Sequence, residues 1–258
     1  MNESLEVYPQ FLRHEEIQSN RDETKFHPSE ATNCSLAVWF LKRHARGLTL
    51  LKPAPQHANL LMIFRIGHLV HHWVQGHYVR TGICEPNGIE YQILDEKRGI
   101  TGSIDLLTKE KVIDLKTCSW KVFSGRIPKH EHIVQTSIYA HYTGRDWIEV
   151  HYIAKDSGKL WNWVEGVDTE AMGMLPVSSE QVPIRVAGFH PREDLVYKAF
   201  EKFAQIETAI QADSPPDPEF SPMEPASPCS LCQWRYHCRD LMGRHHPSLG
   251  ATPVELNG

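Results

Sequence analysis

The chain has 258 residues, 41% of them hydrophobic, so it is long enough to bury a complete core as one large domain. Its 27 basic and 32 acidic residues give a formal net charge of −5, which excludes a polycation that attracts nucleic acid over its whole surface. The longest apolar run, residues 60–64, is far too short to span a membrane, and residues 1–10 lack a signal-peptide core. We therefore expect a soluble cytoplasmic protein without a membrane partner.

The N-terminal part of the sequence predicts an extension over residues 1–28, followed by two helices. Ser29 has the character of a helix N-cap and precedes a helix that ends before Pro53 and Pro55. The second helix carries an apolar stripe at helical spacing, which we expect to face the core. The stripe consists of Leu60, Ile63, Phe64, Gly67, His71 and Val74.

The middle of the sequence predicts mainly strands. Residues 89–93, 100–107 and 111–117 form apolar or alternating runs with short charged turns between them, which is typical of a three-stranded antiparallel meander. A helix is predicted from Pro128, a favoured first helical residue, to about Tyr142. Residues 147–154 and 159–164 then predict a hairpin.

The C-terminal part predicts a long helix from Pro191 with one apolar side. The proline-rich residues 215–228 end it and lead to a cysteine-rich loop, and residues 243–258 are expected to be a disordered tail. The predicted fold class is α/β, with a mixed central sheet flanked by helices. The main domain is expected to cover residues 29–242.

Two carboxylates and a lysine on neighbouring strands form the candidate catalytic group. Asp114 and Lys116 lie two residues apart on one predicted strand, so they share a face, and Asp105 lies on the strand before it. Carboxylate oxygens suit Mg²⁺ or Mn²⁺, and a lysine can offset charge during phosphodiester hydrolysis. Surface acids beside a solvated lysine are the alternative, but Asp114 has apolar neighbours on both sides, where a charge usually has a partner or a function.

A histidine on the second helix is a candidate for the same group. His71 shares the apolar stripe, where a satisfied core histidine is the usual interpretation. Gly67, one turn earlier, lets the helix approach the sheet closely, so the imidazole has access to a metal ion. Gln135 and Tyr139, one helical turn apart, follow the lysine strand and are candidates for contact with the site or with DNA.

Four cysteines have the pattern of a metal centre. Cys229, Cys232 and Cys238 form a C-x2-C-x5-C loop, whereas Cys34 stands alone 195 residues earlier. Four thiolates hold either a [4Fe–4S] cluster or a zinc ion. Zinc sites usually present two close pairs, so the split of one and three favours the cluster, with zinc and His237 as the lesser alternative. Either centre would join the N- and C-terminal segments.

The motif order resembles that of RecB-like nucleases of the PD-(D/E)XK superfamily. The motifs are Gly67-x-x-x-His71, Gly102-Ser103-Ile104-Asp105, Val112-Ile113-Asp114-Leu115-Lys116-Thr117 and Gln135-x-x-x-Tyr139. The resemblance implies a restriction-endonuclease-like core. It further implies catalysis by Lys116, accessory roles for Gln135 and Tyr139, and a metal ion bound by His71, Asp105, Asp114 and the backbone carbonyl of Leu115.

The cysteines narrow the resemblance to the iron–sulfur subgroup, which includes AddB-type nucleases, the fourth CRISPR-associated protein and related phage exonucleases. This resemblance implies a metal-dependent DNA exonuclease that acts on single strands or ends, with 5′→3′ polarity. Its setting would be phage or CRISPR-type DNA processing, recombination or replication, with recombination or integration proteins as partners. A phage-encoded protein would work in the host cytoplasm.

Two other functions remain open from the sequence. One is a DNA-processing or adaptor subunit of an integration complex, and the other is a zinc-stabilised nucleic-acid-binding module without catalysis. Local positive charge fits DNA binding, since residues 111–131 carry a surplus of three basic side chains, although a solvated loop explains them equally well. Near Cys34, four residues are expected either to line a path for single-stranded DNA or to form a solvated basic face: Trp39, Lys42, Arg43 and Arg46.

Overall fold

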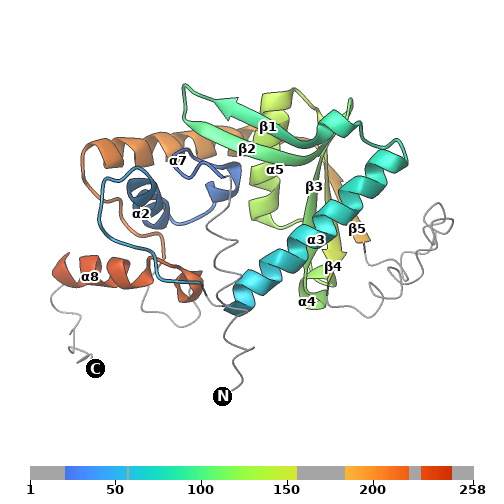
Figure 1. Cartoon of the computed structure of the whole chain (residues 1–258). Coiled ribbons are helices and arrows are strands. Elements are labelled where there is room, and N and C mark those ends of the chain that lie inside the picture. The colour runs from blue at the N-terminus through green and yellow to red at the C-terminus, as the bar shows by residue number, and fades with distance from the viewer. Residues whose placement is uncertain (1–20, 57, 156–183, 221–227, 246–258) are drawn as a thin grey trace, which may run out of the picture. The chain divides into compact units, whose positions relative to one another are not determined.

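The computed structural model describes residues 21–56, 58–155, 184–220 and 228–245 (Figure 1). The chain divides into two compact units, each made of segments that are distant in sequence. The first unit comprises residues 1–32 and 57–201, and the second comprises residues 33–56 and 202–258. No helix in the described part of the chain is long and apolar enough to cross a membrane.

The first unit is built on one five-stranded sheet with the strand order β1-β2-β3-β4-β5. β1 to β3 form the predicted antiparallel meander, β4 runs parallel to β3, and β5 pairs antiparallel with β4. The strands are β1 Ile89–Asp95, β2 Ile100–Leu107, β3 Lys111–Cys118, β4 Trp147–Ala154 and β5 Ile184–Phe189. The predicted α/β class with a mixed sheet flanked by helices is confirmed, and it is consistent with a restriction-endonuclease-like core. The strand predicted over residues 159–164 lies outside the described residues.

The parallel pairing of β3 and β4 requires a crossover, which two helices provide. They are α4 Trp120–Phe123 and α5 His130–Thr143. α5 ends at Gly144, whose φ of 66° is the left-handed conformation that favours glycine at this position. The predicted start of this helix at Pro128 is wrong, because Lys129 is the N-cap and helical geometry begins at His130.

Helices cover both faces of the sheet (Figure 1). Alternate residues of β3 point to opposite faces, so each face of this strand packs against a different helix. α3 Ala58–Arg80 packs on one face, where Val74 and Tyr78 share a core with Ile113 and Leu115. α5 packs on the other, where Tyr139 and Ala140 share a core with Val112 and with Ile148, Val150 and Tyr152 of β4. Both sides of the strand that carries the candidate residues are therefore buried.

The N-terminal half of α3 differs from the prediction. Ile63 and Phe64 are 44% and 48% exposed, so they do not belong to the core-facing stripe. The close approach predicted at Gly67 is confirmed, because a Cβ atom there would lie 3.0 Å from Thr117 Oγ1 of β3. Helical periodicity therefore located the helix correctly but extended its buried face one turn too far towards the N-terminus.

The strand β2 leaves β3 after a short ladder. β2 pairs with β1 through six facing residue pairs, but with β3 only through Leu106↔Ile113 and Leu107↔Val112. The backbone of β3 beyond Ile113 therefore has no strand on its β2 side within the described residues. This opening lies beside the candidate catalytic residues.

Residues 21–30 pack against the start of β2. Phe26 is buried and forms a parallel bridge with Ile100, and the short helix η1 Pro28–Glu30 follows it. The prediction of Ser29 as an N-cap is wrong, because Ser29 lies inside η1. The N-cap of the next helix is Cys34. A further short helix, η2 Pro86–Gly88, precedes β1.

The second unit combines α2 Ser35–Ala45 with the C-terminal elements η4 Pro228–Leu231 and α8 Arg235–His245. The long helix α7 Glu193–Gln211 begins in the first unit and ends in the second. Phe40 of α2 stacks on Trp234, with ring centroids 5.4 Å apart, which ties the two segments together. α8 continues to His245, so residues 243–245 of the predicted disordered tail are helical, and residues 246–258 lie outside the described part.

Candidate active site

Asp105 replaces a missing strand partner at the opening between β2 and β3. Its Oδ2 accepts a hydrogen bond of 2.6 Å from the backbone N–H of Leu115. Leu115 is not among the β3 residues that pair with β2, so this N–H has no partner carbonyl on β2. The N–H and C=O of one strand residue lie on the same edge, so the Leu115 carbonyl also faces the opening. A carboxylate and a backbone carbonyl, both of them oxygen donors, therefore meet at this point.

His71 reaches the same carboxylate from α3. Its Nδ1 lies 3.4 Å from Asp105 Oδ1, and both side chains are mostly buried. Burial lowers the pKa of His71, but the hydrogen bond and charge of Asp105 outweigh burial, so the pKa is raised overall. The histidine of the predicted stripe thus lies against an acid at the opening of the sheet.

Asp114 and Lys116 form a buried ion pair on the α5 face of β3. Asp114 is only 2% exposed, and Lys116 Nζ lies 3.0 Å from its Oδ1 and 2.9 Å from its Oδ2. Within the described residues, Oδ2 accepts no hydrogen bond. Burial raises the pKa of Asp114 to about 6, with the charge of Lys116 opposing the rise and that of Asp105 adding to it. The carboxylate of Asp114 is therefore paired with one ammonium group, in a buried place where its charge is costly.

Lys116 is held as an ammonium group by its neighbours. Burial lowers the pKa of Lys116, but the charges of Asp114 and Asp105 outweigh burial and raise it overall. Nζ donates to Gln135 Oε1 at 3.1 Å, and Gln135 Nε2 donates to Tyr139 Oη at 3.2 Å. Burial raises the pKa of Tyr139, so its hydroxyl keeps its proton. The structure thus brings together all of the candidate catalytic side chains.

A cavity of about 780 Å³ adjoins these residues in the first unit. His71, Asp105, Gln135 and Tyr139 line it, and Asp114 and Lys116 lie behind Gln135 through the hydrogen bonds just described. Gly102 also lines it, and a Cβ atom there would lie 3.1 Å from Tyr139 Cε1. The glycine of the Gly102–Asp105 motif therefore makes room for the tyrosine.

Sequence reasoning missed a polar network beside Asp105. Gln75 is buried, and its Nε2 donates to Glu90 Oε1 at 2.6 Å and to the carbonyl of Asp105 at 3.2 Å. Ser103 Oγ donates to the other oxygen of Glu90, whose φ of 48° is unusual for a residue with a side chain. Gln75 lies four residues after His71, on the same face of the helix, so helical spacing was the signal in the sequence from which it could have been found.

A second missed residue is His132, one turn before Gln135. Its Nδ1 lies 2.6 Å from Tyr152 Oη, which also accepts the backbone N–H of Lys129 at 3.0 Å. Burial lowers the pKa of His132 to about 3, and the charges of Lys116 and Lys129 add to this effect. This imidazole is therefore neutral and fixes the first turn of α5 to the sheet.

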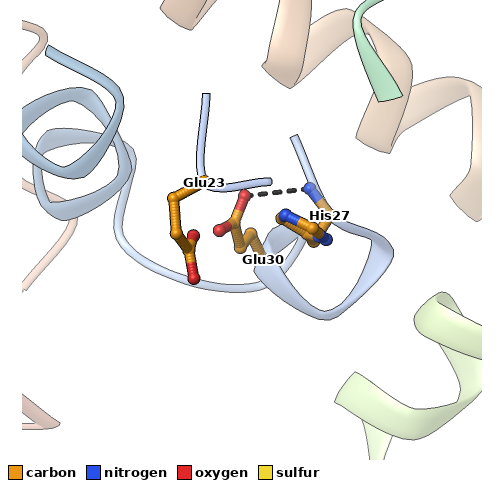
Figure 2. A group of neighbouring side chains, drawn as sticks. All are labelled: Glu23, His27 and Glu30. Carbon is orange, nitrogen blue, oxygen red and sulfur yellow. Dashed lines mark hydrogen bonds between the residues drawn. The ribbon is translucent and has the colours of Figure 1, made fainter. Parts of the chain in front are cut away.

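Glu23, His27 and Glu30 are a separate group of possible metal ligands, with ligand atoms within 4.8 Å of one another (Figure 2). Most of their polar atoms already take part in contacts that hold residues 21–30 together. Arg21 contacts Glu30 Oε1 at 2.9 Å and Glu23 Oε1 at 3.0 Å, so a cation is already present. The N–H of His27 donates to Glu30 Oε2 at 3.0 Å, and His27 Nε2 lies 3.0 Å from the carbonyl of Asp22. We therefore interpret this group as structural, because its contacts stabilise the conformation of residues 21–30.

The four candidate cluster ligands all lie in the second unit: Cys34, Cys229, Cys232 and Cys238. Burial raises the pKa of Cys238 to about 11, and the nearby charges of the other three thiols add to this rise. The structure therefore gathers the four thiols, and their role as cluster ligands stays a prediction. Cys84 and Cys118, in the first unit, are also free thiols.

The basic residues of α2 do not form the expected solvated face, and that prediction is wrong. Lys42 is fully buried, and Arg43 pairs with Asp213 and covers the ring of Trp39 at 4.6 Å. Arg46 pairs with Glu207 at 2.7 Å. These cations are used inside the second unit, which gives no support to a DNA path along them.

Comparison with known proteins gives likeness of structure only. No family model matches the sequence, and no curated protein matches it. The crystal structure of SSO0001 superposes with a TM-score of 0.55 at 14% identity, covering 91% of this chain and 95% of SSO0001. An alkaline exonuclease from Laribacter hongkongensis, LHK-Exo, gives a TM-score of 0.45 at 14% identity over 74% of this chain and 90% of its own, and its complex with dAMP gives 0.46. The likeness to SSO0001 concerns the fold alone, and the lower scores carry no argument about activity.

Proposed function

We propose that the protein is a divalent-metal-dependent nuclease that hydrolyses phosphodiester bonds of DNA. The observation that carries this proposal is that His71 and Asp105 line one cavity at the opening of the sheet, with the buried ion pair of Asp114 and Lys116 behind Gln135. Two carboxylates, an imidazole and an ammonium group in one buried place require a reason, because burying charges is costly. A bound cation next to a reacting phosphate is such a reason.

The donor set fits Mg²⁺ or Mn²⁺. Asp105, Asp114 and the Leu115 carbonyl would supply the oxygen ligands that hard divalent cations prefer, and His71 would add one imidazole nitrogen. The buried Oδ2 of Asp114, which accepts no hydrogen bond within the described residues, supports this fit. When bound, the ion would supply Lewis-acid stabilisation of charge on the phosphoryl oxygens.

The protein's own side chains have distinct tasks in this mechanism. Lys116 uses two of its three N–H donors on Asp114 and Gln135, which leaves one for a phosphate oxygen or for the attacking water. Gln135, fixed by Tyr139, positions the ammonium group. Asp105 is held from two sides by the Leu115 amide and His71, so its orientation is set before substrate arrives.

We also propose that the second unit holds a [4Fe–4S] cluster on Cys34, Cys229, Cys232 and Cys238. The split of one N-terminal and three C-terminal cysteines supports the cluster, because zinc sites usually present two close pairs of ligands. His237, the other candidate for zinc, already has Nε2 placed 2.8 Å from the carbonyl of Lys52.

The finer properties follow from the resemblance to iron–sulfur RecB-like nucleases. We propose an exonuclease that acts on single strands or ends, with 5′→3′ polarity, in DNA processing, recombination or replication. Digestion of end-labelled single- and double-stranded DNA with Mg²⁺ or Mn²⁺ tests activity, polarity and strand preference together. Lys116→Ala should abolish cutting, whereas Lys109→Ala, an exposed lysine of a turn, should cut as the wild type does.

Two results would contradict these proposals separately. Cleavage by Lys116→Ala at the wild-type rate would show that the site is assigned wrongly. Protein purified without oxygen that is colourless and holds one zinc ion would show that the cluster is wrong. Cutting that requires an integrase-like partner would instead favour the adaptor subunit considered from the sequence.

A further inference from the structure

An exposed aromatic residue follows directly after the candidate catalytic strand. Trp120 begins α4 and is 43% exposed, although tryptophan is usually well buried. Its ring stacks on that of Phe123, which is buried, with centroids 5.1 Å apart and an interplanar angle of 25°. Arg185 of β5 supports this pair, because its guanidinium lies 5.8 Å from the Phe123 ring and donates to the carbonyl of Gly125 at 3.2 Å. The exposed ring is therefore held in place.

The segment that contains Trp120 is positively charged, although the chain as a whole is acidic. Residues 117–130 include Lys121, Arg126 and Lys129 but no aspartate or glutamate, whereas the whole chain has a net charge of −5. Lys121 and Arg126 are exposed, and neither forms an ion pair within the described residues. Lys129 has Glu131 as a carboxylate neighbour at 3.7 Å, a weak exposed pair. The cations here are therefore available for a ligand, in contrast to those of α2.

The segment is within reach of the candidate site. Trp120 lies four residues after Lys116, so their Cα atoms are at most about 14 Å apart along an extended chain. Figure 1 shows α4 at the end of the sheet where β3 finishes. At the rise of about 3.4 Å per nucleotide in a stacked DNA strand, this upper limit corresponds to at most about four nucleotides.

We propose that α4 and the following loop bind single-stranded DNA next to the phosphate that is cut, with Trp120 stacking on a base and Lys121 and Arg126 contacting phosphates. An aromatic face beside exposed cations is the combination that unpaired nucleotides require, because every base offers a stacking face and every phosphate a charge. In a duplex the base faces are already stacked, so a single strand is the favoured occupant. This inference rests on the proposed function and specifies the form of its substrate.

The test for stacking is the binding of a fluorescein-labelled single-stranded oligothymidine, followed by anisotropy in EDTA so that no cutting occurs. Trp120→Ala should weaken binding by about 5- to 150-fold, the equivalent of 1–3 kcal/mol per stacked base. Trp120→Phe should retain most of the affinity, which separates stacking from a folding defect. Tyr197→Ala removes another aromatic side chain, 61% exposed on α7, and should change affinity less than twofold.

The test for phosphate contact is the salt dependence of the same binding. Lys121→Ala combined with Arg126→Ala should reduce the slope of log affinity against log salt by about 1.4, or about 0.7 for each lost contact. The matched control combines Lys97→Ala with Lys109→Ala, two exposed lysines in turns of the sheet, and should leave the slope unchanged.

The outcomes separate this inference from the proposed function. Wild-type affinity in a folded Trp120→Ala variant would overturn the stacking, and an equal loss of affinity for blunt duplex DNA would overturn the preference for single strands. If the wild type binds as described but cuts no DNA with Mg²⁺ or Mn²⁺, the proposed function fails and the binding surface stands. If it cuts DNA and Trp120→Ala binds normally, only the surface fails.

Discussion

Two buried polar networks lie on opposite faces of the same sheet and differ in how fully their atoms are paired. On the α3 face, Lys111 Nζ donates to Glu149 Oε1 at 2.6 Å, and Glu149 Oε2 lies 3.0 Å from His151 Nε2. Tyr78 Oη lies 2.7 Å from His151 Nδ1. Because a carboxylate only accepts, Nε2 of His151 carries a proton, and both ring nitrogens have partners. This network is saturated.

On the α5 face, the network around Asp114 keeps unused capacity. One oxygen of Asp114 accepts no hydrogen bond within the described residues. Lys116 donates two of its three N–H groups to Asp114 and Gln135, and the third has neither of them as its acceptor. The neighbouring Asp105 and His71 line a cavity. We therefore expect the saturated network to stabilise the fold, and the unsaturated one beside the cavity to serve the proposed ligand site.

The largest expected effect is on chemistry. Asp114→Asn should lower the rate of DNA cleavage by about 10³-fold, because it removes a carboxylate ligand of the proposed metal ion. Its stability should change little, because removing a buried carboxylate whose raised pKa opposes folding offsets the loss of the charged partner of Lys116. Cleavage assays and urea unfolding measure both quantities. A strongly destabilised but active variant would reverse the comparison.

The saturated network should respond in the opposite way. His151→Phe leaves Glu149 and Tyr78 without their partner and should lower the free energy of unfolding by about 3 kcal/mol. Cleavage by the folded fraction should remain near the wild-type rate, since none of these atoms is placed in the site. Urea unfolding and cleavage below the unfolding midpoint check this. A variant that is stable but inactive would show that the network serves catalysis.

Acid should release part of the saturated network's stability. The hydrogen bond from His151 and the interaction with Lys111 outweigh burial and lower the pKa of Glu149 from 4.5 to about 2. A depressed folded-state pKa stabilises the protein above pH 4.5, and about 2 kcal/mol of that contribution should be lost by pH 3. The difference in unfolding free energy between wild type and Glu149→Gln, followed from pH 6 to pH 3, isolates this group. A difference that does not shrink with falling pH would contradict it.

The smallest expected effect concerns Gln75, which bridges the two elements that carry His71 and Asp105. Gln75→Leu removes its hydrogen bonds to Glu90 and to the Asp105 carbonyl. We expect kcat to fall about tenfold, or about 1.4 kcal/mol, with KM for DNA unchanged, because the substrate contacts remain while the carboxylate is less well oriented. A change in KM alone would assign Gln75 to DNA binding instead.

Much of the fold could be predicted because the determining patterns are local. Alternation of side chains placed Asp114 and Lys116 on one face, and short charged turns between apolar runs gave the meander. The glycine at position 67 indicated the close approach of α3 to Thr117. The structure brings the candidate site residues together as the motif order implied, and their roles stay predictions.

The missed features depend on contacts that are distant in sequence. Arg46 and Arg43 are held by acids 161 and 170 residues away, so a helix that seems amphipathic and basic has its cations inside a unit. Glu90 acquires its place in the site only through Gln75 and Ser103. The exposed Ile63 and Phe64 show that apolar periodicity alone does not decide how far a helix is covered.

The short ladder between β2 and β3 has a consequence for how such a site can arise. Two residue pairs join β2 and β3, and beyond them the carboxylate of Asp105 accepts the backbone N–H of Leu115 in β3. If β2 and β3 were paired along their whole length, a backbone carbonyl of β2 would accept the N–H of Leu115, and the carboxylate of Asp105 would not be needed as its acceptor. The short ladder therefore leaves a carboxylate and a backbone N–H of neighbouring strands to pair at the opening, and the proposed metal site depends on this arrangement.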